Sequence, residues 1–139
     1  MGILGIGIDL LDMNRVNHLY LKYGEKLSKK ILSAREWDYI GELDLSPKKA
    51  SNFIAKRFSM KESLLKAIGI GMGRGMRLID ISIIGDLLSK PQVILNEFST
   101  KFLQEFYDTS ISNLTFNVSV SDQANFITSL AIISSKYSV

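Results

Sequence analysis

The stretch SPKKASNFIAKRFSMKESLLKAIG, residues 46–69, decides the fold, because it is a long helical pattern without an internal breaker. Serine followed by proline favours a helix start, since the hydroxyl caps the first turn and proline fits its first position. Neither glycine nor proline recurs before Gly69, so we expect one long helix from Pro47. Its apolar stripe consists of Ala50, Phe53, Ile54, Phe58, Leu64, Leu65 and Ile68. Such a stripe predicts that one face of the helix packs into the core.

The chain begins with a strand signal. Ile3–Ile8 is a short β-branched run that predicts a buried strand ending at Asp9. Gly5 and Gly7 fall on one face of this strand, which predicts that another segment approaches it closely there.

Two helical signals lie between this strand and the long helix. Apolar residues recur at three- or four-residue spacing over 12–31, which predicts an amphipathic helix that Gly24 can divide in two. Ser33 and Glu36 have the spacing of a capping box, so a short helix is expected to follow through Leu43.

The second half of the chain reads mainly as short strands. The expected elements are a glycine-rich loop at 69–75, strands at 78–84 and 91–95, a helix at 99–107, and a hairpin of 114–121 and 125–134. Because helices and strands come in separate blocks, the expected class is α+β, with an antiparallel sheet packed on the long central helix. A length of 139 residues without linker or repeat predicts a single domain over 1–139.

The composition excludes several kinds of site. Apolar residues make up 46% of the chain and charged residues 22%, which is typical of a globular protein. Zero cysteines exclude disulfides, thiolate metal sites and a cysteine nucleophile, and the single His18 excludes a multi-histidine zinc site. No apolar run is long enough for a signal-peptide core or a membrane span, so we expect a soluble cytoplasmic protein without a membrane partner.

Positive charge is concentrated near the N-terminus. The net charge is +3, yet residues 12–35 alone contain six basic and two acidic side chains. A local basic patch suits an acidic partner or a phosphate-bearing ligand, although charge alone favours a solvated helix face.

Three ionisable residues are candidates for chemistry. Asp9 ends an otherwise apolar strand, where burial of a lone charge is costly. Glu62 and Lys66 lie four residues apart, so they share one face of the long helix. They form either an exposed ion pair or a metal-ligating carboxylate beside a lysine that meets a phosphate. Mg²⁺ is the cation that takes carboxylates, phosphate oxygens and water in this way.

Two further features give weaker signals. The glycine-rich loop at 69–75 lacks the Walker lysine and follows a helix, which argues against a P-loop or a dinucleotide fingerprint. Ser119 and Ser121 have no accompanying Ser-His-Asp set, so we interpret them as strand residues first and as phosphate hydrogen-bond donors second.

Several segments match the motifs of one known family. Arg57–Gly69 is similar to the motif R-F-x-x-K-E-x-x-x-K-A-x-G, and Gly5–Asp9 to the strand G-I-G-x-D. Ile31–Glu36 resembles I-L-[ST]-x-x-E, Asp80–Ile83 resembles D-I-x-[IV], and Lys90-Pro91 resembles the turn G-K-P. In this order, over almost the whole chain, they resemble the holo-[acyl-carrier-protein] synthases, which are small phosphopantetheinyl transferases. The resemblance implies the 4′-phosphopantetheinyl transferase fold.

The resemblance also implies a reaction. The family transfers 4′-phosphopantetheine from coenzyme A to a serine of apo acyl carrier protein, which releases adenosine 3′,5′-bisphosphate and supports fatty acid biosynthesis. At the positions that match the family motifs, the resemblance implies that Asp9 and Glu62 ligate Mg²⁺ and that Lys66 contacts a phosphate. It also makes Glu62 a candidate acceptor of the serine proton, directly or through a metal-bound water. The implied catalytic residues are Glu62, Lys66 and Asp122. The implied coenzyme A contacts are Arg57 at the nucleotide end, Lys66, Gly69, Gly71, Pro91, Ser119 and Ser121.

The same resemblance implies the partners. Acyl carrier proteins are acidic, and a basic surface speeds the encounter with them. The residues expected to meet the carrier protein are Arg15, Lys22, Lys26, Lys29 and Lys30. The resemblance implies a homotrimer with active sites between its subunits. An apolar N-terminal strand and apolar hairpins fit this assembly, because they can pack against symmetry mates. No nucleic-acid partner is expected.

The chain departs from the family pattern at four positions. Ile70 stands in place of the threonine of a G-T-G sequence, and Ser89 in place of the glycine before Lys90-Pro91. Asn117 stands where a histidine is usual, and Asp122 takes an acidic variant of a second histidine position. Asp122 either acts on the metal or the proton, or caps the hairpin turn by bonding its own backbone.

Two other functions stay open at the level of sequence. A non-catalytic module that holds coenzyme A or the carrier protein is supported only by Ile70 and Asn117, and the retained Asp9, Glu62 and Lys66 argue against it. A nucleic-acid-binding domain is suggested only by a pI near 9.1. The basic residues lack interleaved aromatics on strands, which argues against that interpretation.

Overall fold

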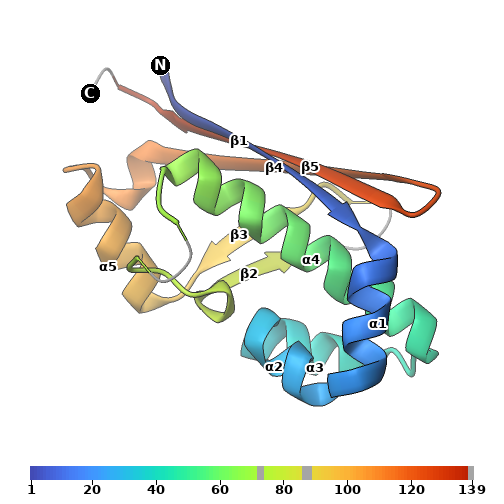
Figure 1. Cartoon of the computed structure of the whole chain (residues 1–139). Coiled ribbons are helices and arrows are strands. Elements are labelled where there is room, and N and C mark those ends of the chain that lie inside the picture. Colours follow the sequence, from blue (N-terminus) through green and yellow to red (C-terminus); the bar gives the residue numbers. More distant parts are fainter. Residues whose placement is uncertain (72–73, 86–88, 138–139) are drawn as a thin grey trace.

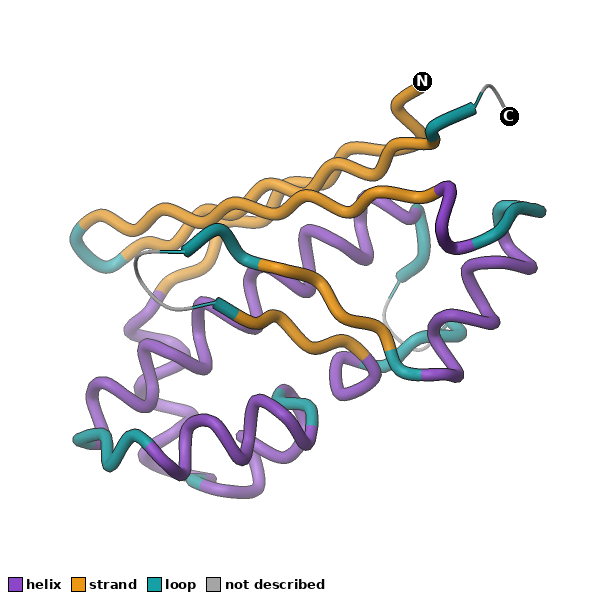
Figure 2. The backbone as a smooth tube through the Cα atoms, turned by 180° about the vertical axis from the view of Figure 1, so that it is seen from behind, coloured by secondary structure: helices purple, strands orange, loops and turns teal. Residues whose placement is uncertain are grey.

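A three-stranded antiparallel sheet lies along one long helix, and a two-stranded sheet packs beside them (Figures 1 and 2). The computed structural model describes residues 1–71, 74–85 and 89–137. The helices are α1 (Met13–Tyr23), α2 (Glu25–Ile31), α3 (Ala34–Glu42), α4 (Pro47–Ile68) and α5 (Glu97–Phe106). The strands are β1 (Gly2–Asp12), β2 (Ile81–Ile84), β3 (Gln92–Leu95), β4 (Leu114–Gln123) and β5 (Phe126–Ser135). The predicted α+β class, with an antiparallel sheet on a long central helix, is confirmed.

The long helix α4 begins and ends as the sequence predicts. The Ser46 hydroxyl accepts from the Lys49 backbone N–H, and Gly69 ends the helix in the left-handed conformation at φ +86°. One side of α4 supplies fully buried side chains, including Ile54, Met60 and Leu64. Met60 and Leu64 form the main core with apolar residues of the β2–β3 sheet and the three-stranded sheet, whereas Ile54 packs with Ile31 and Leu32 at the end of α2.

Strand β1 lies directly on α4 through its two glycines, as predicted. A Cβ atom at Gly5 would collide with the Ala67 carbonyl, and one at Gly7 with the Ser63 carbonyl. Two residues of a strand span about 6.8 Å and four residues of a helix about 6 Å, so the two repeats nearly match. The next step in this series brings Asp9 against Ser59, where the two side chains form a hydrogen bond.

The predicted helix breaks are confirmed in the N-terminal half. Gly24 separates α1 from α2 with φ +50° and ψ −124°, a conformation that favours glycine. Ser33 and Glu36 form the reciprocal capping box that opens α3.

Four predicted boundaries differ from the structure. Strand β1 continues past Asp9 to Asp12, because hydrogen bonds satisfy the buried Asp9 carboxylate and the ladder with β5 goes on. The stretch from Leu78 to Asp80 is a 3₁₀ turn, stabilised where the Asp80 carboxylate accepts from Arg77. Helix α5 begins at Glu97, not at residue 99, because the Asn96 side chain caps it.

The fourth difference concerns the C-terminal hairpin. Strand β4 continues to Gln123, so Asp122 belongs to the strand and the turn consists of residues 124 and 125. Residues 72–73 of the predicted glycine-rich loop and 86–88 of the predicted turn at 85–90 lie outside the described residues. Within the described part of the chain, no helix is both long and apolar enough to cross a membrane.

Candidate active site

The Asp9 side chain is the centre of a polar cluster between β1 and α4. Asp9 is 9% exposed, and both of its carboxylate oxygens are hydrogen-bonded. Oδ1 accepts from Lys66 Nζ at 3.0 Å, and Oδ2 accepts from Ser59 Oγ at 2.9 Å. Lys66 Nζ also donates to the Ile8 carbonyl at 3.0 Å. Gly7 lies beside the Lys66 stem, so the absence of a side chain there lets the lysine run along the strand to Asp9.

Glu62 adds a second carboxylate to this cluster. Its Oε1 atom is buried and has no hydrogen-bond partner among the described residues. Burial raises the pKa of Glu62, the nearby Asp9 charge raises it further, and Lys66 opposes both. Two carboxylates therefore share one lysine, which leaves the cluster one positive charge short.

This charge shortage fits a divalent cation. Mg²⁺ binds through one or two carboxylates and completes its shell with water and phosphate oxygens. Asp9 and Glu62 supply two such ligands, and the unpartnered Glu62 oxygen gives one of them a free acceptor. No three His, Cys, Asp or Glu side chains gather as a metal-binding group in the described part of the chain. A cation held by these two carboxylates would take its remaining oxygens from water or a bound phosphate.

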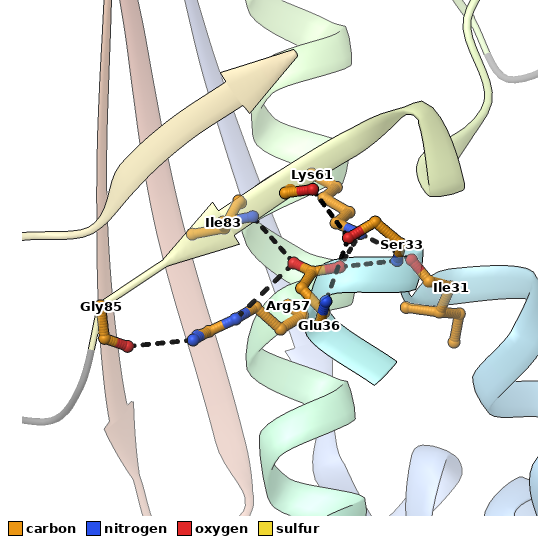
Figure 3. Close-up of polar contacts among 8 residues, drawn as sticks. Ile31, Ser33, Glu36, Arg57, Lys61, Ile83 and Gly85 are labelled. Atoms are coloured by element: carbon orange, nitrogen blue, oxygen red, sulfur yellow. Dashed lines mark hydrogen bonds and ion pairs between the residues drawn. The ribbon is translucent and has the colours of Figure 1, made fainter. Parts of the chain in front are cut away.

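A second charged cluster lies elsewhere on α4 and is almost completely satisfied (Figure 3). The Glu36 carboxylate accepts from the backbone N–H groups of Ser33 and Ile83, each at 2.8 Å. It also forms an ion pair with Lys61, which is fully buried and donates to the Ile31 carbonyl at 2.7 Å. Burial lowers the pKa of Lys61, and Glu36 opposes that effect. The cluster ties α2, α3, α4 and β2 together.

Arg57 joins this second cluster at its open side. Its Nε lies 3.7 Å from Glu36 Oε1, and its Nη2 donates to the Gly85 carbonyl at 3.1 Å. The guanidinium stacks over the Phe53 ring at 4.3 Å. Arg57 also lines a pocket of about 530 Å³. The other residues that line it are Arg35, Glu36, Asp38, Tyr39, Glu42, Ile83, Ile84 and Gly85.

The remaining site residues expected from the sequence are spread over the fold. Gly69 caps α4, Gly71 is exposed, and Pro91 lies against Gly85 just before β3. Ser119 and Ser121 are opposite Leu130 and Thr128 of β5, and these side chains are exposed on the sheet face that turns away from α4. One protomer therefore does not bring the two serines to Asp9 and Glu62.

Asp122 lies on the same sheet face as Asp9 but two strands away. The register and normal strand spacings put their Cα atoms about 12 Å apart. Asp122 instead forms an ion pair with Lys56 of α4 at 2.9 Å. At the neighbouring departure from the family pattern, the Asn117 side chain accepts from Lys90 Nζ at 2.8 Å.

The basic N-terminal residues are displayed on two consecutive helices. Arg15 and Lys22 of α1, and Lys26, Lys29 and Lys30 of α2, are all exposed. Lys29 pairs with Glu25 at 3.6 Å, an exposed contact that leaves the local charge strongly positive. The same helices bury Val16 and Ile31 on their other sides, so the basic face is directed to solvent.

Sequence reasoning missed Ser59, which donates to Asp9, and Ser129, which bonds to Ser59. Ser59 precedes Glu62 by one helical turn, and that spacing was a usable signal. No sequence signal pointed to Ser129, because its contact with Ser59 joins residues seventy positions apart.

Comparison with known proteins identifies the class to which this fold and site belong. The chain belongs to the 4′-phosphopantetheinyl transferase superfamily, whose sequence model matches residues 5–127. A protein of Wigglesworthia glossinidia brevipalpis named holo-[acyl-carrier-protein] synthase is 38% identical over 112 residues, 80% of this chain and 81% of its own.

Solved structures agree with this assignment. The crystal structure of holo-[acyl-carrier-protein] synthase from Neisseria meningitidis superimposes with a TM-score of 0.80 at 27% identity, covering 96% of this chain and 99% of that one. A holo-(acyl-carrier-protein) synthase from Bacillus anthracis, solved in complex with CoA (3′,5′-ADP), gives a TM-score of 0.73 at 26% identity. It covers 96% of this chain and 98% of that one.

Proposed function

We propose that this chain is a holo-[acyl-carrier-protein] synthase, which transfers 4′-phosphopantetheine from coenzyme A to a serine of apo acyl carrier protein. The observation that carries the proposal is the grouping of Asp9, Glu62 and Lys66 in a superfamily whose reaction is this transfer. The second product is adenosine 3′,5′-bisphosphate, and the transfer supplies the carrier protein for fatty acid biosynthesis.

Asp9 and Glu62 would hold Mg²⁺ in this proposal. When bound, the ion neutralises charge that develops on the pyrophosphate oxygens as the phosphate leaves. Lys66 is half-exposed and bonds to an aspartate and a carbonyl, so it is free to turn to a substrate phosphate. Its ammonium group would then stabilise the negative charge of the transition state.

Glu62 is the candidate acceptor of the carrier serine proton. The support is its place beside Asp9 and Lys66 with one carboxylate oxygen that the described residues leave free to accept; burial raises the pKa of Glu62 in the metal-free chain, and a bound cation would oppose that shift. The proton would arrive either directly or through a metal-bound water. Gly69 and Gly71, at the end of the same helix, are the proposed backbone contacts for the pantetheine phosphate.

The nucleotide end of coenzyme A is proposed to bind near Arg57. The support is the pocket that this residue lines, where the guanidinium is held by the Gly85 carbonyl and the Phe53 ring. Pro91 is next to Gly85 and would complete the wall. A guanidinium fixed in this way suits a phosphate or a purine face.

The carrier protein is proposed to dock on α1 and α2. Support comes from the exposed basic residues of these helices, which would face an acidic partner. Charges on such a rim raise the association rate more than the intrinsic affinity, and their effect falls with salt.

A homotrimer is proposed as the active assembly. The face of the three-stranded sheet that turns away from α4 exposes Ile6, Ile8 and Leu10, which are 60–70% accessible in one protomer. Apolar surface of this kind marks an interface. Ser119 and Ser121 share that face, so they would serve the active site of a neighbouring subunit and not their own. Within the trimer, 1–139 would act as a single domain, and the proposed location is the cytoplasm.

The test is a direct transfer assay. The protein is incubated with apo acyl carrier protein, coenzyme A and Mg²⁺, and the carrier mass is followed by mass spectrometry. The proposal expects addition of one phosphopantetheine, loss of the reaction with EDTA, and recovery with excess Mg²⁺. Coenzyme A binding without any transfer would identify a non-catalytic binding module instead.

A further inference from the structure

Ser59 and Lys66 bond to different carboxylate oxygens of Asp9. Ser59 is fully buried and donates to Asp9 Oδ2 at 2.9 Å, whereas Lys66 occupies Oδ1. Ser59 precedes Glu62 by three residues, so one face of α4 presents the serine, the glutamate and the lysine to the same aspartate.

Ser129 of β5 orients the Ser59 hydroxyl. The two Oγ atoms are 2.8 Å apart, and Ser129 Oγ also donates to the Ser59 carbonyl at 2.8 Å. An ionised carboxylate only accepts, and each hydroxyl has a single proton. The Ser59 proton is therefore committed to Asp9, so the Ser59 hydroxyl can only accept from Ser129, whose single proton is shared between the Ser59 hydroxyl and the Ser59 carbonyl. Either arrangement keeps Ser129 against Ser59 and leaves the Ser59 proton on Asp9.

We propose that Ser59 and Ser129 are positioning residues that hold the Asp9 carboxylate in its orientation for cation binding beside Glu62. The inference rests on the proposed metal site. Lys66 is about half-exposed and leaves Oδ1 when it turns to a phosphate, whereas Ser59 is enclosed in the protein interior. The Ser59 bond is then the one that prevents the carboxylate from rotating. Mutation of a residue that hydrogen-bonds to a metal ligand commonly lowers metal affinity 10- to 100-fold.

The chain offers a matched control at Ser63. It is as completely buried as Ser59, follows it by one helical turn, and donates only to the Met60 carbonyl of its own helix. Ser59→Ala and Ser63→Ala therefore each remove one buried hydroxyl from α4, but only the first removes a bond to Asp9.

The test measures the affinity of the protein for Mn²⁺, which serves as a spectroscopic probe of the metal site. Free Mn²⁺ is followed by electron paramagnetic resonance in the presence of saturating coenzyme A, and coenzyme A alone provides the background. We expect Ser59→Ala to raise the Kd for Mn²⁺ about tenfold, Ser129→Ala to raise it less, and Ser63→Ala to leave it unchanged. In turnover, Ser59→Ala should raise the half-saturating Mg²⁺ concentration and leave the KM for coenzyme A unchanged. Saturating Mg²⁺ should restore most of kcat.

Three results would overturn the inference in distinguishable ways. An unchanged Mn²⁺ Kd in Ser59→Ala, with normal binding by the wild-type protein, would overturn the positioning role alone. An equal loss in Ser63→Ala would show that any cavity in α4 weakens the site, which also overturns it. Wild-type protein that binds no Mn²⁺ above the background would overturn the proposed metal site and the inference together.

Discussion

Helix α4 contributes to two charged clusters that differ in how well their charges are balanced. Around Glu36, two backbone N–H groups and the Lys61 ammonium all point at one carboxylate, with Arg57 beside it. Around Asp9, the Glu62 carboxylate has an unpartnered oxygen, and a single lysine serves both acids. The first arrangement ties four elements of the fold together, and the proposed function has the second completed by a bound cation. The four variants below separate these roles.

The largest expected effect is on stability, from Glu36→Ala. This variant leaves the buried Lys61 charge and two backbone N–H groups without their acceptor. Removing one partner of a buried ion pair costs about 3–5 kcal/mol of unfolding free energy. Urea unfolding followed by circular dichroism measures it. Glu42→Ala, in the exposed part of the same helix α3, is the control and should stay within about 0.5 kcal/mol. A loss below 1 kcal/mol in Glu36→Ala would contradict the structural role.

The next effect is on catalysis, from Glu62→Gln. Removing this charge should lower transfer by at least about 100-fold, because a ligand and the candidate base are lost together. The mass-spectrometric assay measures it. Near wild-type turnover in Mg²⁺ would show that Glu62 is not a metal ligand.

The same substitution should make the metal-free protein more stable. Because the folded state raises the pKa of Glu62, its ionised form opposes folding above that pKa, and the penalty disappears as the pH falls through it. Glu62→Gln should therefore raise Tm in EDTA by about 1–4 °C at neutral pH. This gain should shrink in acid. A lower Tm at neutral pH would mean that Glu62 is satisfied in the free protein.

A smaller effect is expected from reversing the charges of Lys26, Lys29 and Lys30 to glutamate. At low salt the KM for the carrier protein should rise about tenfold, and the KM for coenzyme A should not change. The difference should narrow at high salt, because screening removes the electrostatic contribution. Steady-state kinetics over a salt series measure both constants.

A charge-matched variant makes this experiment specific. Reversing Arg74, Lys101 and Lys136, which are exposed outside α1 and α2, changes the net charge by the same amount. An equal rise in the carrier KM would show that total charge matters and that α1 and α2 are not the docking face.

The smallest effect is expected from Asp122→Asn. Its partner Lys56 is on α4, and half-exposed ion pairs contribute at most about 1 kcal/mol, so turnover should change less than about threefold. Turnover measured across pH and Mg²⁺ concentration distinguishes a structural role of Asp122 from a role in metal binding or proton transfer. A loss above tenfold that depends on either variable would place Asp122 in the chemistry.

The sequence predicted what local rules govern, and failed where distant residues meet. Helix α4 was predictable because Ser46, Pro47 and Gly69 act within one turn of its ends. The contact at Gly5 and Gly7 was predictable because glycine at two alternate strand positions lies on one face, where it lets a neighbouring backbone approach closely. Glu36 was recognised only as a capping residue, since its partner Ile83 is 47 positions away. Asp9 was expected to end its strand for the same reason, because its Ser59 partner is 50 positions away.

The pairing of β1 joins two segments that are far apart in the sequence. Among the described strands, β1 is hydrogen-bonded to β5 alone, and Ile6 is opposite Ile132. During synthesis, the Asp9 segment is therefore made long before β5, the strand that pairs with it. Closing so long a loop is entropically costly and slow. The side-chain partners of Asp9 lie on α4, however, so the aspartate can meet Ser59 and Lys66 once this helix has formed, and the site can assemble before its sheet is complete.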